Sequence, residues 1–157
     1  MVCVALFVFP TLDATVHAQA LKIRTRDGQQ TITHSLTEGT QTFVPVRWDI
    51  QNARYRNGCT VQWTAAAFEH ETDPSHQADC QVVLRLAEST RESRWNITTA
   101  KDATDIATGR DTATVSLTAN GRGHASVELL LRFDGSKAAE LAAGRYRTTI
   151  TGTISGL

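Results

Sequence analysis

The sequence lacks any excess of charge of one sign. Its 16 Lys and Arg residues balance its 16 Asp and Glu residues. Proteins that bind nucleic acids usually carry a basic patch, and proteins that bind anionic membranes carry a run of basic residues. The sequence shows neither feature, and it also lacks an apolar run of the length that a membrane-spanning helix requires. We therefore expect no nucleic-acid partner and no membrane span.

Motifs for catalysis and for cofactor binding are also missing. There is no G-x-S-x-G around a serine, no HExxH helix, and no glycine-rich loop with a phosphate-binding lysine. The densest polar segment, FEHETDPSHQAD at residues 68–79, holds ligand types for a divalent cation. Because an Asp-Pro step interrupts it, we prefer a solvated loop to a metal site. The sequence predicts no enzyme activity, no metal and no cofactor.

The N-terminal segment, MVCVALFVFPTLDATVHAQA, has features of a secretory signal. An apolar run over residues 2–10 is followed by Ala18 and Ala20, in the A-x-A pattern that signal peptidase accepts. We expect residues 1–20 to be a signal peptide and residues 21–157 to form a single domain. The segment lacks the basic residues that usually precede such a run, and the alternative is a buried first strand.

Cysteine is scarce, and its three residues show no CxxC or Cys/His spacing typical of structural zinc. Removal of the signal would take Cys3 away and leave Cys59 and Cys80. An even number of cysteines in an oxidising compartment indicates a disulfide, which we expect between Cys59 and Cys80. Two unpaired buried thiols are the alternative.

Helical periodicity is almost absent beyond the N-terminal segment. Short runs alternate apolar and polar residues, as strands with one buried face do, and turn-forming pairs such as Asn57-Gly58 separate them. The expected strands cover residues 21–26, 31–36, 43–50, 60–65, 81–87, 94–98, 113–118, 125–133 and 145–154. One short helix is expected over residues 136–144. Strands at this spacing predict an all-β sandwich.

Aromatic residues are few, at 6% of the chain, and all three tryptophans lie in expected strands. We expect Trp48, Trp63 and Trp95 to pack in the core, because a buried aromatic ring contributes much of the apolar area of a small domain. A surface platform that stacks on carbohydrate is the alternative.

The C-terminal segment alternates in the same way and carries a recognisable motif. It reads AAGRYRTTITGTISGL, in which Gly144 precedes an alternating series that includes Tyr146, Ile150 and Ile154. This segment resembles the C-terminal β-motif of bacterial chaperone–usher pilus subunits. Gly144 is the fourteenth residue from the C-terminus. In that family a glycine at this distance from the C-terminus precedes an alternating apolar strand, often as AG-x-Y.

The resemblance implies an immunoglobulin-like sandwich that lacks its final strand and is completed by donor-strand exchange. In that family a periplasmic chaperone fills the open groove first, and the N-terminal extension of the next subunit then replaces it. Such pairing is β-augmentation, in which main-chain hydrogen bonds give affinity and alternate side chains set the register. Carried onto this chain, the acceptor edge comprises Gly144, Tyr146, Ile150 and Ile154, and the donor strand carries Leu21, Ile23 and Thr25.

Together these features predict a non-catalytic structural subunit of a bacterial surface fibre, a fimbria or pilus involved in adhesion. The expected partners are neighbouring subunits, a periplasmic chaperone and an usher, with a host glycan or protein as a further ligand. The expected location is the periplasm and then the cell surface. The alternative is a self-complete secreted β-sandwich module that binds a glycan or a protein.

Overall fold

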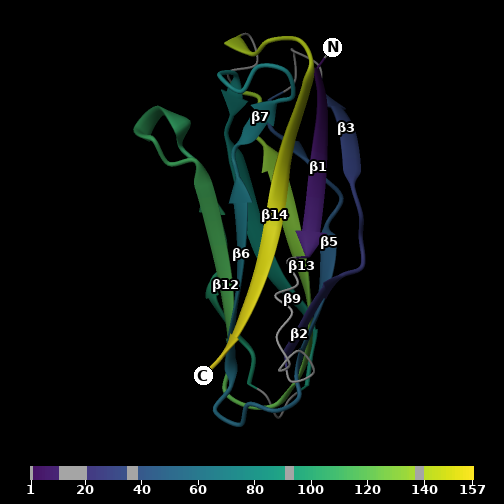
Figure 1. Ribbon diagram of the computed structural model, residues 1–157, viewed down its shortest axis with the longest axis vertical. Helices are drawn as coiled ribbons and strands as arrows, with labels where there is room; N and C mark the ends of the chain where they lie inside the picture. The colour runs from purple at the N-terminus through teal and green to yellow at the C-terminus, as the bar shows by residue number, and fades with distance from the viewer. Residues whose placement is uncertain (1, 11–20, 35–38, 91–93, 137–139) are drawn as a thin grey trace.

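The computed structural model describes residues 2–10, 21–34, 39–90, 94–136 and 140–157. Apart from one turn of 3-10 helix at Ile106–Thr108, the regular elements in these ranges are β-strands. The strands form two sheets that pack face to face (Figure 1). The chain is therefore an all-β sandwich, and the predicted fold class is confirmed.

In the described ranges the first sheet contains eight strands, among them the first and the last, β1 and β14. Its order across the sheet is β10 (Asn96–Thr99), β12 (Thr112–Ala119), β6 (Cys59–Ala66), β14 (Arg145–Gly156), β1 (Val2–Pro10) and β3 (Gln30–His34). Two short strands extend it, since β7 (Phe68–His70) pairs with β14 and β8 (Gln77–Ala78) pairs with β7.

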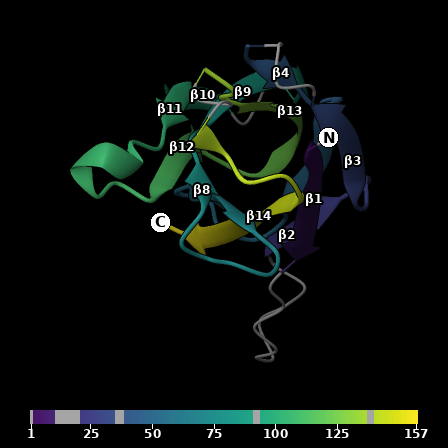
Figure 2. The same ribbon diagram turned by 90° about the horizontal axis from the view of Figure 1, so that it is seen from above.

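The second sheet contains six strands among the described residues. Its order is β11 (Lys101–Ala103), β9 (Cys80–Ser89), β13 (Gly123–Phe133), β5 (Val46–Asn52) and β2 (Leu21–Thr25), and β4 (Gln41–Thr42) pairs with β13. Each of the nine strands expected from the sequence overlaps one observed strand. Figure 2, a view from above, shows the two sheets as opposing layers.

The core lies between the sheets, where the inward residues of the long strands β5, β6, β12, β13 and β14 are buried. Along β5 the burial alternates, so that Trp48 and Ile50 face inward while Arg47 and Asp49 face outward. Trp48 packs against Trp63 of β6 with ring centroids 6.3 Å apart and an interplanar angle of 70°. This edge-to-face geometry is favourable for aromatic rings and links the two sheets at their centre.

The predicted role of the tryptophans is confirmed. Trp48 and Trp63 are 0% exposed and Trp95 is 9% exposed, so all three belong to the core. The alternative of a carbohydrate-stacking platform is wrong for these tryptophans, because Trp48 and Trp63 are fully buried and Trp95 is nearly so.

The predicted disulfide is wrong, because Cys59 and Cys80 are free cysteines at opposite ends of the sandwich. Cys59 begins β6 and Ala66 ends it. A strand rises about 3.3 Å per residue, which places these two residues on the order of 20 Å apart. The Cys80 thiol donates a hydrogen bond to the Ala66 carbonyl oxygen at 3.3 Å. Since a disulfide needs Cα atoms within about 7 Å, the structure shows the alternative of two unpaired buried thiols.

Two other expectations concern residues that lie partly or wholly outside the described ranges. The short helix expected over residues 136–144 includes residues 137–139, which lie outside the described residues. Ala18 and Ala20, the expected cleavage site, also lie outside them. Among the residues that are described, no helix has the length and apolar character needed to span a bilayer.

Candidate strand-accepting edge

Strand β14 carries the predicted acceptor residues and lies in the interior of the first sheet. Its burial alternates, with Tyr146, Thr148, Ile150 and Gly152 buried between the sheets. The next inward residue, Ile154, is half-buried and packs against the core. The alternation predicted from the sequence is confirmed for this strand, and it fixes which face of β14 meets the second sheet.

At the start of β14, Gly144 and Tyr146 meet His70 of the polar segment at residues 68–79, a contact that the sequence did not predict. The His70 ring lies edge-on to Tyr146, with centroids 5.1 Å apart. A Cβ atom added at Gly144 would lie 2.0 Å from His70 Nε2, so glycine leaves room for this ring. The Tyr146 hydroxyl donates a hydrogen bond to the Ala142 carbonyl oxygen at 3.3 Å, and burial raises the pKa of the phenol. These contacts hold the first residues of β14 against β7.

Further along β14, Gly152 provides the space that the central tryptophans occupy. A Cβ atom here would lie 3.0 Å from Trp48 Cζ3 and 3.1 Å from Trp63 Cδ1. It would also lie 2.9 Å from Ile23 Cδ1 on β2. The missing side chain therefore allows the two sheets to approach closely around the Trp48–Trp63 pair.

The two edges of β14 have different partners. On one side it pairs antiparallel with β6 over the register Ile150–Ala65 to Gly156–Cys59, and with β7 near Tyr146. On the other side it pairs in parallel with β1, from Cys3 opposite Arg145 to Pro10 opposite Gly152. The other pairings among the described strands are antiparallel. Both views show β1 beside β14 (Figures 1 and 2).

Strand β1 also connects β14 to the edge strand β3. It pairs antiparallel with β3, from Val2 opposite His34 to Leu6 opposite Gln30. Within the described residues, β3 has no other strand partner in this sheet. A chain without β1 would thus expose the hydrogen-bonding groups along one side of β14 and leave β3 unattached.

The residues that form β1 are those predicted to be a secretory signal. In the full chain they adopt a strand, which was the alternative interpretation of the segment. Removal of residues 1–20 during export stays a prediction. The sequence signal that could have indicated a strand is the content of Val and Phe in residues 2–10, since β-branched and aromatic residues favour strands.

The predicted donor residues occupy a place in their own chain. Leu21, Ile23 and Thr25 lie on β2, which pairs antiparallel with β5 at the edge of the second sheet. Leu21 and Ile23 are partly buried against the core. The structure therefore does not bring these residues to the edge of β14, and their role as a donor strand stays a prediction.

The polar segment at residues 68–79 uses its carboxylates in local contacts. Asp73 accepts hydrogen bonds from Ser75 and lies 3.1 Å from His76 Nδ1. Glu71 pairs with Arg147 of β14 at 2.7 Å. Within the ranges that the structure describes, no group of three or more His, Cys, Asp or Glu side chains is arranged to hold a metal ion.

Comparisons with known proteins give little further information. No family model matches the chain, and no curated protein matches it. Among solved structures, the collagen-binding domain of a Staphylococcus aureus adhesin is similar with a TM-score of 0.21 and 8% sequence identity. The match covers 77% of this chain and 100% of that chain. A similarity this weak supports no conclusion about function, and the sandwich rests on the strand pairing described above.

Proposed function

We propose that this chain is a non-catalytic structural subunit of a bacterial surface fibre involved in adhesion, assembled by β-strand donation at the edge of β14. One observation carries the proposal. The strand that covers this edge, β1, is formed by the residues that the sequence predicts to be removed on export. Export would then open the same edge that the C-terminal motif predicts to accept a donated strand.

The physical basis is the chemistry of an open strand edge. An unpaired strand presents a row of backbone N–H and C=O groups that another strand can satisfy. The inward residues of β14, among them Tyr146 and Ile150, are already ordered by the core, so an incoming strand meets a rigid template. In this proposal a periplasmic chaperone occupies the edge first, and a neighbouring subunit replaces it at the usher.

The donor in this proposal is the first strand of the mature chain, with Leu21, Ile23 and Thr25 on one face. In the structure this strand is β2, which lies at the edge of its sheet and pairs only with β5 among the described strands. An edge strand with one partner is the element of a sheet that detaches most readily. Donation would exchange its pairing with β5 for pairing with β14 of the next subunit.

The experiment expresses residues 19–157 behind a heterologous export signal in an oxidising periplasm. We expect oligomers that appear as ladders on unheated gels in detergent. The matched control lacks residues 19–27 and keeps the acceptor edge, and we expect it to form no ladder. The full chain, expressed in the cytoplasm with β1 in place, is expected to be monomeric.

The contradicting result is a soluble monomer of residues 19–157 with one cooperative unfolding transition. That result would favour the alternative function, a self-complete secreted module that binds a glycan or a protein.

A further inference from the structure

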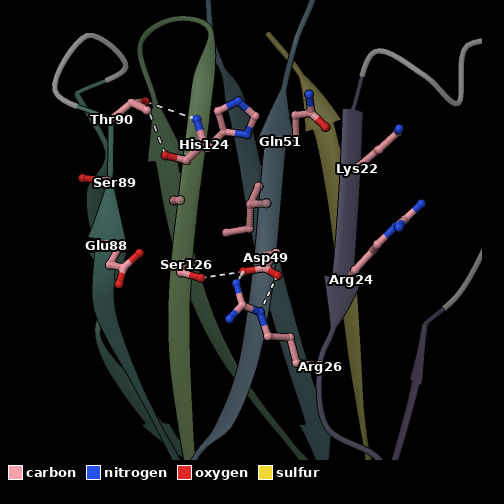
Figure 3. A pocket seen from close by; sticks show the side chains of 12 residues that line it. Lys22, Arg24, Arg26, Asp49, Gln51, Glu88, Ser89, Thr90, His124 and Ser126 are labelled. Atoms are coloured by element: carbon pink, nitrogen blue, oxygen red, sulfur yellow. Dashed lines mark hydrogen bonds and ion pairs between the residues drawn. The ribbon is translucent and has the colours of Figure 1, made fainter.

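An open groove of about 580 Å³ lies on the outer face of the second sheet, away from β14. Polar residues of four strands, β2, β5, β13 and β9, line it together with Arg26 and Thr90, which directly follow β2 and β9 (Figure 3). Its two apolar lining residues, Ile50 and Ala125, are buried toward the core. The surface of the groove is therefore polar.

Strand register arranges the lining residues in two rows across the sheet. In one row Arg24 is opposite Asp49, which is opposite Ser126. In the next row Lys22 is opposite Gln51, which is opposite His124. The rows are neighbours because each strand contributes every second residue to this face.

The charge of Asp49 is balanced by Arg26, which follows the end of β2. The Arg26 guanidinium donates to both carboxylate oxygens of Asp49, with Nε–Oδ2 and Nη2–Oδ1 distances of 2.6 and 2.8 Å. Ser126 donates a third hydrogen bond to Asp49, and the Arg26 contact lowers the pKa of this carboxyl. The charge of Glu88, on the far side of the groove, also acts on Arg26. Asp49 is thus already neutralised by a residue other than Arg24.

Lys22 and Arg24 of the groove have no side-chain partner in the described part of the chain. Figure 3 shows Arg26 turned back toward Asp49, while Lys22 and Arg24 project from β2 without a contact. The side chains of Gln51 and His124 likewise make no hydrogen bond within the described residues. This end of the groove therefore combines two uncompensated positive charges with a free amide and a free imidazole.

We infer that this groove binds an acidic oligosaccharide, with Lys22 and Arg24 pairing with its carboxylate or sulfate groups. Gln51 and His124 are placed to hydrogen-bond its hydroxyl groups. A sugar chain fits better than an acidic peptide, because the groove has no exposed apolar or aromatic pocket in which a peptide side chain could anchor. The site requires β2 to be paired with β5, so the inference concerns the chain in which β2 has not been donated.

The test measures binding of a heparin-derived oligosaccharide to the full chain by calorimetry. We expect binding that weakens as salt is raised, since the contacts are between exposed charges. The double variant Lys22→Gln/Arg24→Gln should lower the affinity by about tenfold, because two exposed charged contacts of about threefold each multiply.

The control is Arg85→Gln/Lys101→Gln, which removes the same charge from exposed positions of the same sheet outside the groove. It should change the affinity by less than about twofold, as expected for screened charges outside the site. Equal losses in both variants would show non-specific charge attraction and overturn the inference. It is also overturned by absence of binding, or if a neutral oligosaccharide or a polyglutamate peptide binds as tightly.

Discussion

A chain that begins at Gln19 is expected to lose on the order of 5 kcal/mol of its free energy of unfolding when it is studied as a dilute monomer. The reason is the loss of β1, which pairs with β14 from Cys3 to Pro10 and with β3 from Val2 to Leu6. A backbone hydrogen bond contributes about 1 kcal/mol net, and a whole domain is stable by only about 5–15 kcal/mol. Urea unfolding of the full and shortened chains at equal low concentration measures the difference.

The lost stability should be recovered when the missing strand is added back as a peptide. A synthetic peptide of residues 2–10 should restore the stability of the shortened chain in proportion to its concentration, because it binds only the folded state. A peptide of the same composition in scrambled order is the control and should restore much less. A shortened chain as stable as the full chain would show that β1 adds nothing, and the open-edge account would fail.

The substitution Gly58→Ala is expected to cost about 4 kcal/mol or more, because it combines a backbone clash with an unfavourable dihedral angle. Gly58 has φ of +109°, and an added Cβ would lie 1.7 Å from the backbone oxygen of Ala119. The backbone at the end of β12 cannot move aside as a flexible side chain could. Thermal or urea unfolding of the variant gives the loss directly.

Gly109→Ala separates the two causes of that loss. Gly109 also has a positive φ, of +80°, but nothing lies within 4 Å of the position of its Cβ. This control should cost only about 1 kcal/mol, from the dihedral angle alone. Equal costs at the two glycines would show that the turn before β6 is free to shift away from Ala119.

Sequence patterns predicted the long strands because burial on one side imposes alternation on them. In β13, for example, Val127, Leu129 and Leu131 are all 0% exposed, as their spacing requires. The short strands β4, β7, β8 and β11 were not predicted. A strand of two or three residues is too short to show a period, so its pairing is decided by neighbours that are distant in the sequence.

Local sequence patterns did not decide whether residues 2–10 form a strand or whether Cys59 and Cys80 are paired. Residues 2–10 are apolar without alternation, and such a run suits an export signal and a strand inside a sheet equally well. The number of cysteines says nothing of their separation, and Cys59 and Cys80 lie at opposite ends of the sandwich. The contact of His70 with Tyr146 was missed for the same reason, since it depends on the pairing of β7 with β14.

The central claim is that the edge of β14 accepts a strand supplied from outside the folded domain, and cross-linking at one residue pair tests it most directly. Phe7 of β1 is opposite Thr149 of β14. Neighbouring strands lie about 4.8 Å apart, within the Cα separation that a disulfide allows. The shortened chain would carry Thr149→Cys, and the peptide of residues 2–10 would carry Cys3→Ser with Phe7→Cys.

The native thiols do not interfere with this experiment, because burial raises the pKa of Cys59 to about 11 and that of Cys80 to about 12. The control peptide carries Cys3→Ser with Phe9→Cys, a position opposite Thr151. The account predicts rapid cross-linking by the Phe7→Cys peptide and little by the Phe9→Cys peptide. Equal cross-linking by both peptides, or by neither, would contradict it.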